Sequence, residues 1–144
     1  MAKGLFFIAL MTAALASPPL WGRSNSSVQV VANARVAERA LSREQLRAIF
    51  TLKQPVWADG SSVVVVVLPK RHPVHHQFCR QHLRLLPYQL DLAWGGRHFE
   101  DREHRPLVVG SEKEMRQTLE STPGAIGYLS DDTQLSANLV RLAF

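Results

Sequence analysis

A row of five valines, Val63 to Val67, is the most distinctive hydrophobic stretch of the chain. The run is too short to span a membrane and has no helical period. It is typical of a strand buried on both faces in a parallel sheet that helices cover. We expect this strand in the middle of the core. Ligands in open α/β sheets lie beyond the carboxyl ends of strands, against the next helix N-terminus, so the loop after Pro69 is the first place to look for function.

Shorter patterns predict the rest of the fold. Strands are expected at residues 28–31, 107–109, 125–129 and 138–144. Capping boxes predict helices that start at Ser42, with Gln45 three residues later, and at Ser111, with Glu114. Two more helical pieces begin at Pro73, running to about Leu86, and at Pro87, running to about Phe99. The expected inward positions are Leu46, Ile49, Phe50, Phe78, Leu83, Leu86, Met115 and Leu119. Strands alternating with helices indicate an α/β layer.

The amino end has the pattern of a signal peptide. Lys3 precedes an apolar segment, residues 5–15, and the small-x-small triplet 14–16 fits a cleavage site before Ser17. We therefore expect a signal peptide over 1–16, a flexible leader over 17–27 and a single domain over 28–144. The predicted location is the periplasm.

Charge and cysteine content narrow the picture only a little. The chain has 17 basic and 12 acidic residues. Removal of Lys3 with the signal peptide leaves 16 against 12, a net charge of +4. This balance speaks to association with anions or membrane surfaces and not to fold. Cys79 is the single cysteine, so no internal disulfide is possible and the core must hold the fold unaided.

Three stretches of the chain become familiar when taken together. They are Leu41-Ser42-x-x-x-Leu46-x-x-Ile49-Phe50, then Trp57-x-Asp59-Gly60, then Thr122-Pro123-Gly124-Ala125-Ile126-Gly127-Tyr128. In order and spacing they resemble the phosphate-binding, PstS-like type of periplasmic solute-binding protein, over about residues 28 to 130. The resemblance implies a type 2 periplasmic-binding-protein fold, in which two α/β lobes enclose an anion. This chain is similar to one lobe, the second, with a mixed sheet flanked by helices.

The segment after the valine strand departs from the family pattern. Family members that bind phosphate carry an Arg-Ser-Asp-x-Ser-Gly-Thr run there, whose hydroxyl and N–H groups hold the oxyanion. Here the sequence reads Lys70-Arg71-His72-Pro73-Val74-His75-His76, and Pro73 has no N–H to donate. The resemblance implies the fold and the location of the site and leaves the ligand open.

Two binding sites are candidates in this region. Residues 60–90 contain four cations, four histidines and no acid. In the first candidate site Lys70, Arg71 and His72 bind a small anion at a helix N-terminus. The second is a zinc or copper site. On a helix, His75, Cys79 and His82 fall within an arc of about 60°, and imidazole and thiolate suit both metals. The same arc could instead be the core-facing side of the helix.

Other chemistry finds less support in the sequence. Cys79 has histidines nearby but no identifiable third group to orient them, so we do not expect an enzyme, and no cofactor is implied. Scattered basic residues without interleaved aromatic ones argue against nucleic acid. The prediction is a non-catalytic, solute-binding-like protein that binds a small anion such as phosphate, for ABC-type uptake or for sensing. The alternatives are a partner-binding signalling module and the metal-binding protein. A membrane transporter or a sensor protein is the expected partner, and the oligomeric state is left open.

Overall fold

The computed structural model describes residues 27–95 and 105–144. The predicted signal peptide, nearly all of the predicted leader and the expected end of the third helical piece near Phe99 lie outside these ranges. Among the helices of the described ranges, none has the length and apolar character needed to cross a membrane.

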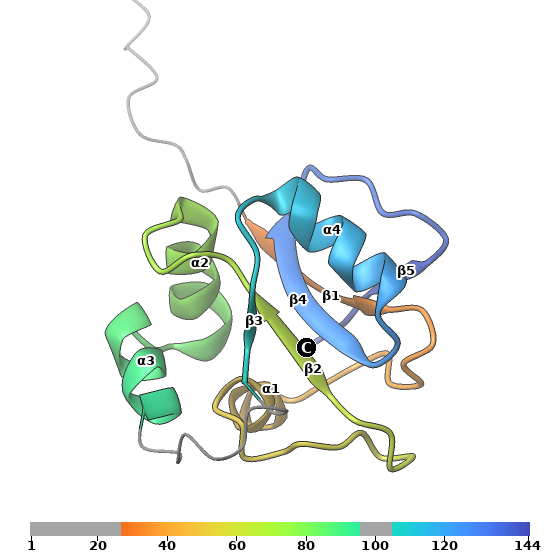
Figure 1. The fold of residues 1–144 in the computed structure, drawn as a ribbon, viewed down its shortest axis with the longest axis horizontal. Helices are drawn as coiled ribbons and strands as arrows, with labels where there is room; N and C mark the ends of the chain where they lie inside the picture. Colours follow the sequence, from red (N-terminus) through yellow and green to blue (C-terminus); the bar gives the residue numbers. More distant parts are fainter. Residues whose placement is uncertain (1–26, 96–104) are drawn as a thin grey trace, which may run out of the picture.

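The described residues form one mixed sheet with helices on both faces. The elements in chain order are β1 (Val28–Asn33), α1 (Arg43–Phe50), β2 (Val64–Val67), α2 (Pro73–Phe78), the π-helix η1 (Cys79–Leu83), α3 (Pro87–Gly95), β3 (Leu107–Val108), α4 (Glu112–Ser121), β4 (Ala125–Ser130) and β5 (Leu139–Arg141). The strands lie side by side in the order β3-β2-β4-β1-β5 (Figure 1). Strand β2 runs parallel to β3 and β4, whereas β1 is antiparallel to both β4 and β5. The predicted α/β layer with a mixed sheet is therefore confirmed.

The valine strand is buried as expected, but it is not the central strand. Val65, Val66 and Val67 are all buried. The middle position belongs to β4, and β2 is separated from the sheet edge only by the two-residue strand β3. The expected place of the valine strand in the core is confirmed, and the centre of the sheet lies at β4 because β1 pairs antiparallel on the far side of β4.

The two faces of β4 show how the helices are divided between the sides of the sheet. A Cβ atom added at Gly127 would lie 2.5 Å from Met115 Sδ, so this face is covered closely by α4. The next side chain, Tyr128, points to the other face, where its ring stacks on Phe78 of α2 with centroids 4.0 Å apart. Phe50 of α1 packs on Phe78 at 4.7 Å. Helix α4 therefore covers one face, and α1 and α2 cover the other.

Most of the predicted helical features are confirmed. Ser42 and Gln45 form the full capping box at the start of α1. The predicted inward residues of α1, α2, η1 and α4 are all buried, namely Leu46, Ile49, Phe50, Phe78, Leu83, Met115 and Leu119. Leu86 is the exception, with 48% of its surface exposed. The helix from Pro73 continues as η1 and stops at Arg84, whose φ of 54° is left-handed, so the chain has already turned before Leu86.

The run from Thr122 to Tyr128 has a structural explanation in two glycines. Gly124 has a φ of +79°, and a Cβ atom there would collide with the backbone carbonyl oxygen of Ser62. The carbonyl oxygen of Gly124 also accepts a hydrogen bond of 3.0 Å from the indole N–H of Trp57, which is buried. The turn before β4 is thereby joined to the segment before β2, and both Gly124 and Gly127 occupy positions that leave no room for a Cβ atom.

Candidate functional site

The loop that leaves β2, residues 68–72, lies at the edge of the sheet where two parallel strands end. The N–H of Val109 donates to the carbonyl oxygen of Val67 at 2.9 Å, just beyond the β2–β3 pairing. The exit of β2 and the residues that begin α4 therefore lie beside each other. This is the edge at which the strand rule for open α/β sheets places ligands.

Within the exit loop, each predicted ligand-binding side chain has a different environment. His72 caps α2, because its Nδ1 accepts a hydrogen bond of 3.2 Å from the N–H of Val74. Lys70 Nζ is 2.7 Å from Asp91 Oδ2 of α3. Arg71 is exposed. The structure places the three candidates on one loop, with the cation of Arg71 facing water and that of Lys70 partly neutralised by Asp91.

The neighbouring helix end is occupied by carboxylates. Glu114 accepts a hydrogen bond of 2.6 Å from the N–H of Gly110, while its own N–H donates to Ser111 Oγ at 3.2 Å. The Ser111 half of the predicted capping box is confirmed, but Glu114 bonds to the residue before the cap. Glu112 accepts from the N–H and the hydroxyl of Ser130, at 2.6 and 2.7 Å. Two carboxylates therefore flank Lys113 at the amino end of α4, and both accept hydrogen bonds from neighbouring backbone.

The three predicted metal ligands do not come together around one position. His75 and Cys79 are neighbours, with 3.6 Å between Nε2 and Sγ. His82 Nε2 lies 2.5 Å from the carbonyl oxygen of Val28 and donates to it, and the His82 ring packs beside Phe144 with centroids 5.1 Å apart. Within residues 27–95 and 105–144 no three histidine, cysteine or acidic side chains could hold a metal ion. The metal prediction is therefore corrected: the three side chains share a helical arc, but η1 winds more widely than an α-helix and directs His82 to β1.

Burial also makes Cys79 a poor nucleophile. The thiol is fully buried, and burial, together with the charge of Asp91, raises its pKa to about 12. A thiol with so high a pKa carries almost no thiolate near neutral pH, and thiolate is the reactive form. This agrees with the alternative that Cys79 lies on the core-facing side of its helix.

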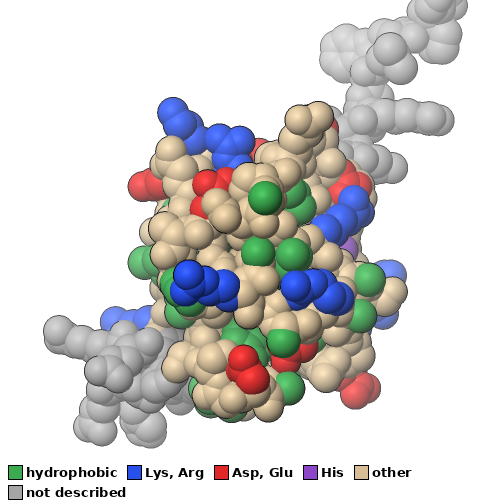
Figure 2. All heavy atoms as spheres, turned by 90° about the vertical axis from the view of Figure 1, so that its right-hand side faces the viewer, with side chains coloured by type: hydrophobic (Ala, Val, Ile, Leu, Met, Phe, Trp, Pro, Cys, Tyr) green, Lys and Arg blue, Asp and Glu red, His purple; other side chains and the backbone are tan. Residues whose placement is uncertain are grey.

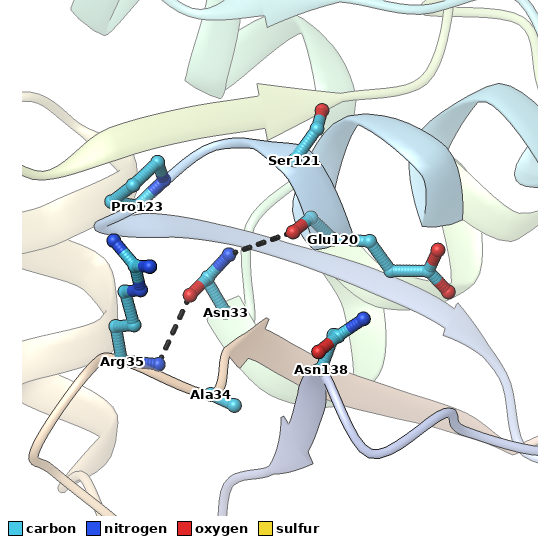
Figure 3. Close-up of a pocket in the computed structure, with 7 residues that line it drawn as sticks. All are labelled: Asn33, Ala34, Arg35, Glu120, Ser121, Pro123 and Asn138. Atoms are coloured by element: carbon cyan, nitrogen blue, oxygen red, sulfur yellow. Dashed lines mark hydrogen bonds between the residues drawn. The ribbon is translucent and has the colours of Figure 1, made fainter.

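A separate hollow of about 240 Å³ lies at the opposite edge of the sheet (Figure 3). It is lined by Asn33, Ala34, Arg35, Glu120, Ser121, Pro123 and Asn138. The side-chain amide of Asn33 is buried and donates to the carbonyl oxygens of Leu119 and Glu120 at 2.8 and 3.2 Å, and its Oδ1 accepts from the N–H of Arg35 at 3.0 Å. The inner wall of the hollow is therefore already hydrogen-bonded and closes the carboxyl end of α4.

The surface does not concentrate charge of one sign over the right-hand side of Figure 1. Figure 2 shows basic and acidic side chains interspersed with apolar ones on this face. A broad basic surface of the kind that binds nucleic acid is not present on this face. A charge-based site has to be local, as in the exit loop.

Two residues that matter to the exit loop were not singled out from the sequence. Asp91 is 21 positions after Lys70, and no local pattern announces their ion pair. Tyr128 is part of the familiar run, but the contact of its hydroxyl with the N–H of Leu68, at 2.9 Å, crosses 60 positions. The N–H of Leu68, at the end of a buried strand, needs an acceptor, and only the folded chain shows that the Tyr128 hydroxyl provides it.

Comparison with known proteins gives a fold and little else. No protein-family profile and no curated protein sequence match the chain. Several solved structures resemble it, including the following three. A putative phosphate ABC transporter substrate-binding protein with bound phosphate from Clostridium perfringens has a TM-score of 0.59, and this chain is 14% identical to it over 80% of this chain and 43% of the other. An ABC-type phosphate transport receptor from Vibrio cholerae has a TM-score of 0.58 and 18% sequence identity, over 80% of this chain and 45% of the other. PstS from Borrelia burgdorferi has a TM-score of 0.62 and 14% sequence identity, over 81% of this chain and 46% of the other.

The chain thus spans less than half the length of the solved structures that it resembles. The predicted fold, one lobe of a phosphate-binding type of solute-binding protein, is confirmed at the level of backbone architecture. Sequence identities of 14–18% do not identify a ligand for this chain.

Proposed function

We propose that this chain is a non-catalytic solute-binding protein whose exit loop binds a small oxyanion, with inorganic phosphate as the first ligand to test. The single observation that carries the proposal is the position of Arg71 and Lys70. They stand at the carboxyl end of β2 in a fold otherwise seen in phosphate-binding proteins. The likeness supports a solute-binding role, and the loop chemistry supports an anion.

The ion pair between Lys70 and Asp91 does not stand in the way of this role. The two side chains are 58% and 35% exposed, and an exposed pair of this kind contributes only ~0–1 kcal/mol. An arriving anion can therefore compete with Asp91 for the ammonium group. Arg71 adds a planar fork of donors that matches two oxygens of phosphate or sulfate.

The site is expected to be weak. Pro73 lacks an N–H, His72 already bonds the N–H of Val74, and Glu114 takes the N–H of Gly110. With these three backbone positions unavailable, two exposed cations are consistent with a Kd of roughly 1 mM, equivalent to about −4 kcal/mol.

Isothermal titration with phosphate and sulfate at constant ionic strength tests the proposal. Arg71→Ala and Lys70→Ala should each weaken binding by about tenfold, the effect of losing one charge-assisted hydrogen bond. Lys53→Ala removes the same charge from an exposed position after α1 and should leave Kd within about twofold. Absence of any binding by the parent chain, or equal loss in the three variants, would contradict the proposal.

Asp91→Asn sharpens the test because it moves affinity in the opposite direction. The substitution frees Lys70 and removes a negative charge beside the loop, so phosphate should bind about three- to tenfold more tightly. The gain should disappear when Lys70→Ala is combined with Asp91→Asn. An unchanged Kd in Asp91→Asn would mean that Lys70 takes no part.

The proposal extends to location and partner. The structures in the comparison are described as an ABC transporter substrate-binding protein and a transport receptor, which supports a membrane transporter as the partner of this chain. Export to the periplasm through cleavage of residues 1–16 is part of the same proposal. Amino-terminal sequencing of the exported protein should begin at Ser17, and a start at residue 1 or 2 would contradict it.

A second candidate, a partner-binding module, is favoured by one observation. Helix α3 exposes large apolar side chains, with Tyr88 at 52% and Leu92 at 69%. Exposed apolar side chains that gather on one element are typical of a protein-contact surface. With the purified chain alone, this candidate function can be tested as self-association. Light scattering over a concentration series should then show a mass that Leu92→Glu returns to the monomer value, whereas a monomer throughout would remove this form of the candidate.

A further inference from the structure

Beneath the exit loop, the core contains a connected set of buried polar side chains. His75 is 1% exposed, and Tyr128 and Cys79 are fully buried. The Tyr128 hydroxyl is 2.9 Å from the N–H of Leu68, the residue that opens the exit loop, and 2.5 Å from His75 Nδ1. His75 lies in α2, directly after the loop. The hydroxyl of Tyr128 therefore joins the two ends of the exit loop from below.

Counting donors assigns the protons in this set. The N–H of Leu68 can only donate, so the Tyr128 oxygen is its acceptor and the phenolic proton is available for another bond. His75 Nδ1 is the acceptor within reach of that proton, and this pairing requires Nδ1 to be unprotonated. A neutral imidazole has one proton, which leaves it on Nε2, directed to Cys79 Sγ at 3.6 Å. The geometry is satisfied by neutral His75 in its Nε2–H form.

A second proton on His75 would disrupt this arrangement. Nδ1–H would then face the phenolic O–H donor at 2.5 Å, so the hydroxyl would have to rotate and its proton would lose this acceptor. The ionisable groups that act on His75 are His72 of the exit loop and His76 of α2, which oppose its protonation, and Asp91 of α3, which favours it. Burial opposes it most strongly and, with the two histidines, lowers the pKa of His75 to about 4.

We infer that Tyr128 and His75 are positioning residues that hold the exit loop in place, and that protonation of His75 releases the loop from Tyr128. The part of this inference that concerns ligand affinity rests on the proposed anion site. The part that concerns loop geometry does not, because the hydrogen bonds exist without a ligand.

The direct readout is the backbone amide of Leu68. Amide exchange, expressed as a protection factor so that the intrinsic effect of pH is removed, should show Leu68 protected at pH 7. In Tyr128→Phe the Leu68 protection should fall about tenfold or more, while Val66 in the middle of β2 stays within about threefold. His76→Gln, which changes the exposed neighbour of His75, should leave Leu68 protection unchanged. Unchanged Leu68 protection in Tyr128→Phe would overturn the inference.

A second test uses the parent chain without any substitution, so its result does not depend on whether a variant folds. Nitrogen-15 spectra of the imidazoles should show His75 with its proton on Nε2 at pH 7. On acidification, loss of Leu68 protection should follow the titration of His75 and not that of the exposed histidines. A proton on Nδ1, or Leu68 protection that persists after His75 has titrated, would overturn the inference.

Sulfate then connects the loop to the site, because its charge is constant between pH 5 and pH 7. At pH 7, Tyr128→Phe should weaken sulfate binding by about threefold or more, while His76→Gln should not. If the parent chain binds neither sulfate nor phosphate, the proposed function fails, and the amide and imidazole measurements still decide the positioning role. If the parent binds and Tyr128→Phe binds equally well, the loop is not positioned for the anion by Tyr128 and this inference fails instead.

Discussion

His75 is a buried base, and its environment makes the stability of the whole fold depend on pH. In the folded chain its pKa is lowered to about 4, chiefly by burial, from the ordinary value of 6.5 that applies to the unfolded chain. As pH falls below 6.5, the unfolded chain takes up a proton that the folded chain refuses, so the free energy of unfolding decreases. The loss continues to about pH 4 and amounts to ~3 kcal/mol for a difference of this size. Urea denaturation at several pH values between 7.5 and 4 measures it.

The control for this prediction keeps an acceptor and removes the titration. In His75→Asn the amide oxygen can take the place of Nδ1 as acceptor for Tyr128. The difference in unfolding free energy between pH 7 and pH 4.5 should therefore be smaller in His75→Asn than in the parent by about 2 kcal/mol. Identical pH profiles for the two proteins would show that His75 is not the group responsible.

At the residue scale, the sequence showed which kinds of side chain the exit loop carries but not which residues they contact. It identified Lys70, Arg71 and His72 as one loop, because they follow a strand of unmistakable pattern. It could not show that His72 caps α2 or that Lys70 meets Asp91, since both facts depend on how α2 and α3 are turned. For the metal candidates the assumption of 100° per residue failed across η1, where the winding is wider.

Asn33 connects two elements through its side chain, and its loss should be felt in α4. The amide donates to the last carbonyl groups of that helix, at 2.8 Å for Leu119. Asn33→Ala leaves buried acceptors unpaired and should lower the free energy of unfolding by about 1–3 kcal/mol. Asn138→Ala, an exposed position on the same hollow, should change it by no more than about 0.5 kcal/mol. Thermal or urea unfolding of the two variants checks the contrast, and equal effects would contradict it.

Two glycines with similar backbone angles separate conformational strain from close contact. Gly60 has a φ of +85° with open space around it, and Gly124 has a φ of +79° against the Ser62 carbonyl. Gly60→Ala should therefore lower the free energy of unfolding by about 1 kcal/mol, the strain of a left-handed residue. Gly124→Ala adds overpacking against backbone, for a total of about 3 kcal/mol. The denaturation midpoints of the two variants measure the difference, and a cost for Gly60→Ala as large as that for Gly124→Ala would refute the role of the contact.

At the element scale, periodicity and caps predicted most helices and strands, and the order of the strands lay beyond them. A buried valine run has the same appearance whether it is the second or the third strand of a sheet. The central place of β4 follows from the antiparallel return of β1, which is encoded in contacts between residues about 100 positions apart, such as Val28 with Ser130. The end of the second helix was missed for a related reason, because nothing in the type of Arg84 announces its left-handed backbone.

For the molecule as a whole, the resemblance to less than half of a longer protein raises the question of whether the described part is one folding unit. Its sheet is covered on both faces, by α4 on one side and by α1 and α2 on the other (Figure 1). The buried apolar residues form one continuous cluster that extends through β4 to both faces. A core of this kind should unfold in a single cooperative step.

Matched substitutions on the two faces make that expectation measurable. Leu46 of α1 and Leu119 of α4 are both fully buried, and each Leu→Ala change should lower the free energy of unfolding by about 2–5 kcal/mol. If the two faces form one unit, each substitution shifts the whole transition, and far-UV circular dichroism and the fluorescence of Trp57 report the same midpoint in both variants. Trp57 is a suitable reporter because it is 2% exposed and bonded to Gly124, and Trp21→Phe together with Trp94→Phe removes the other two indoles of the sequence. If Leu119→Ala moved the dichroism midpoint and left that of Trp57 in place, the α4 face would unfold separately. The described residues would then depend on further chain, or on a partner, for their cooperativity.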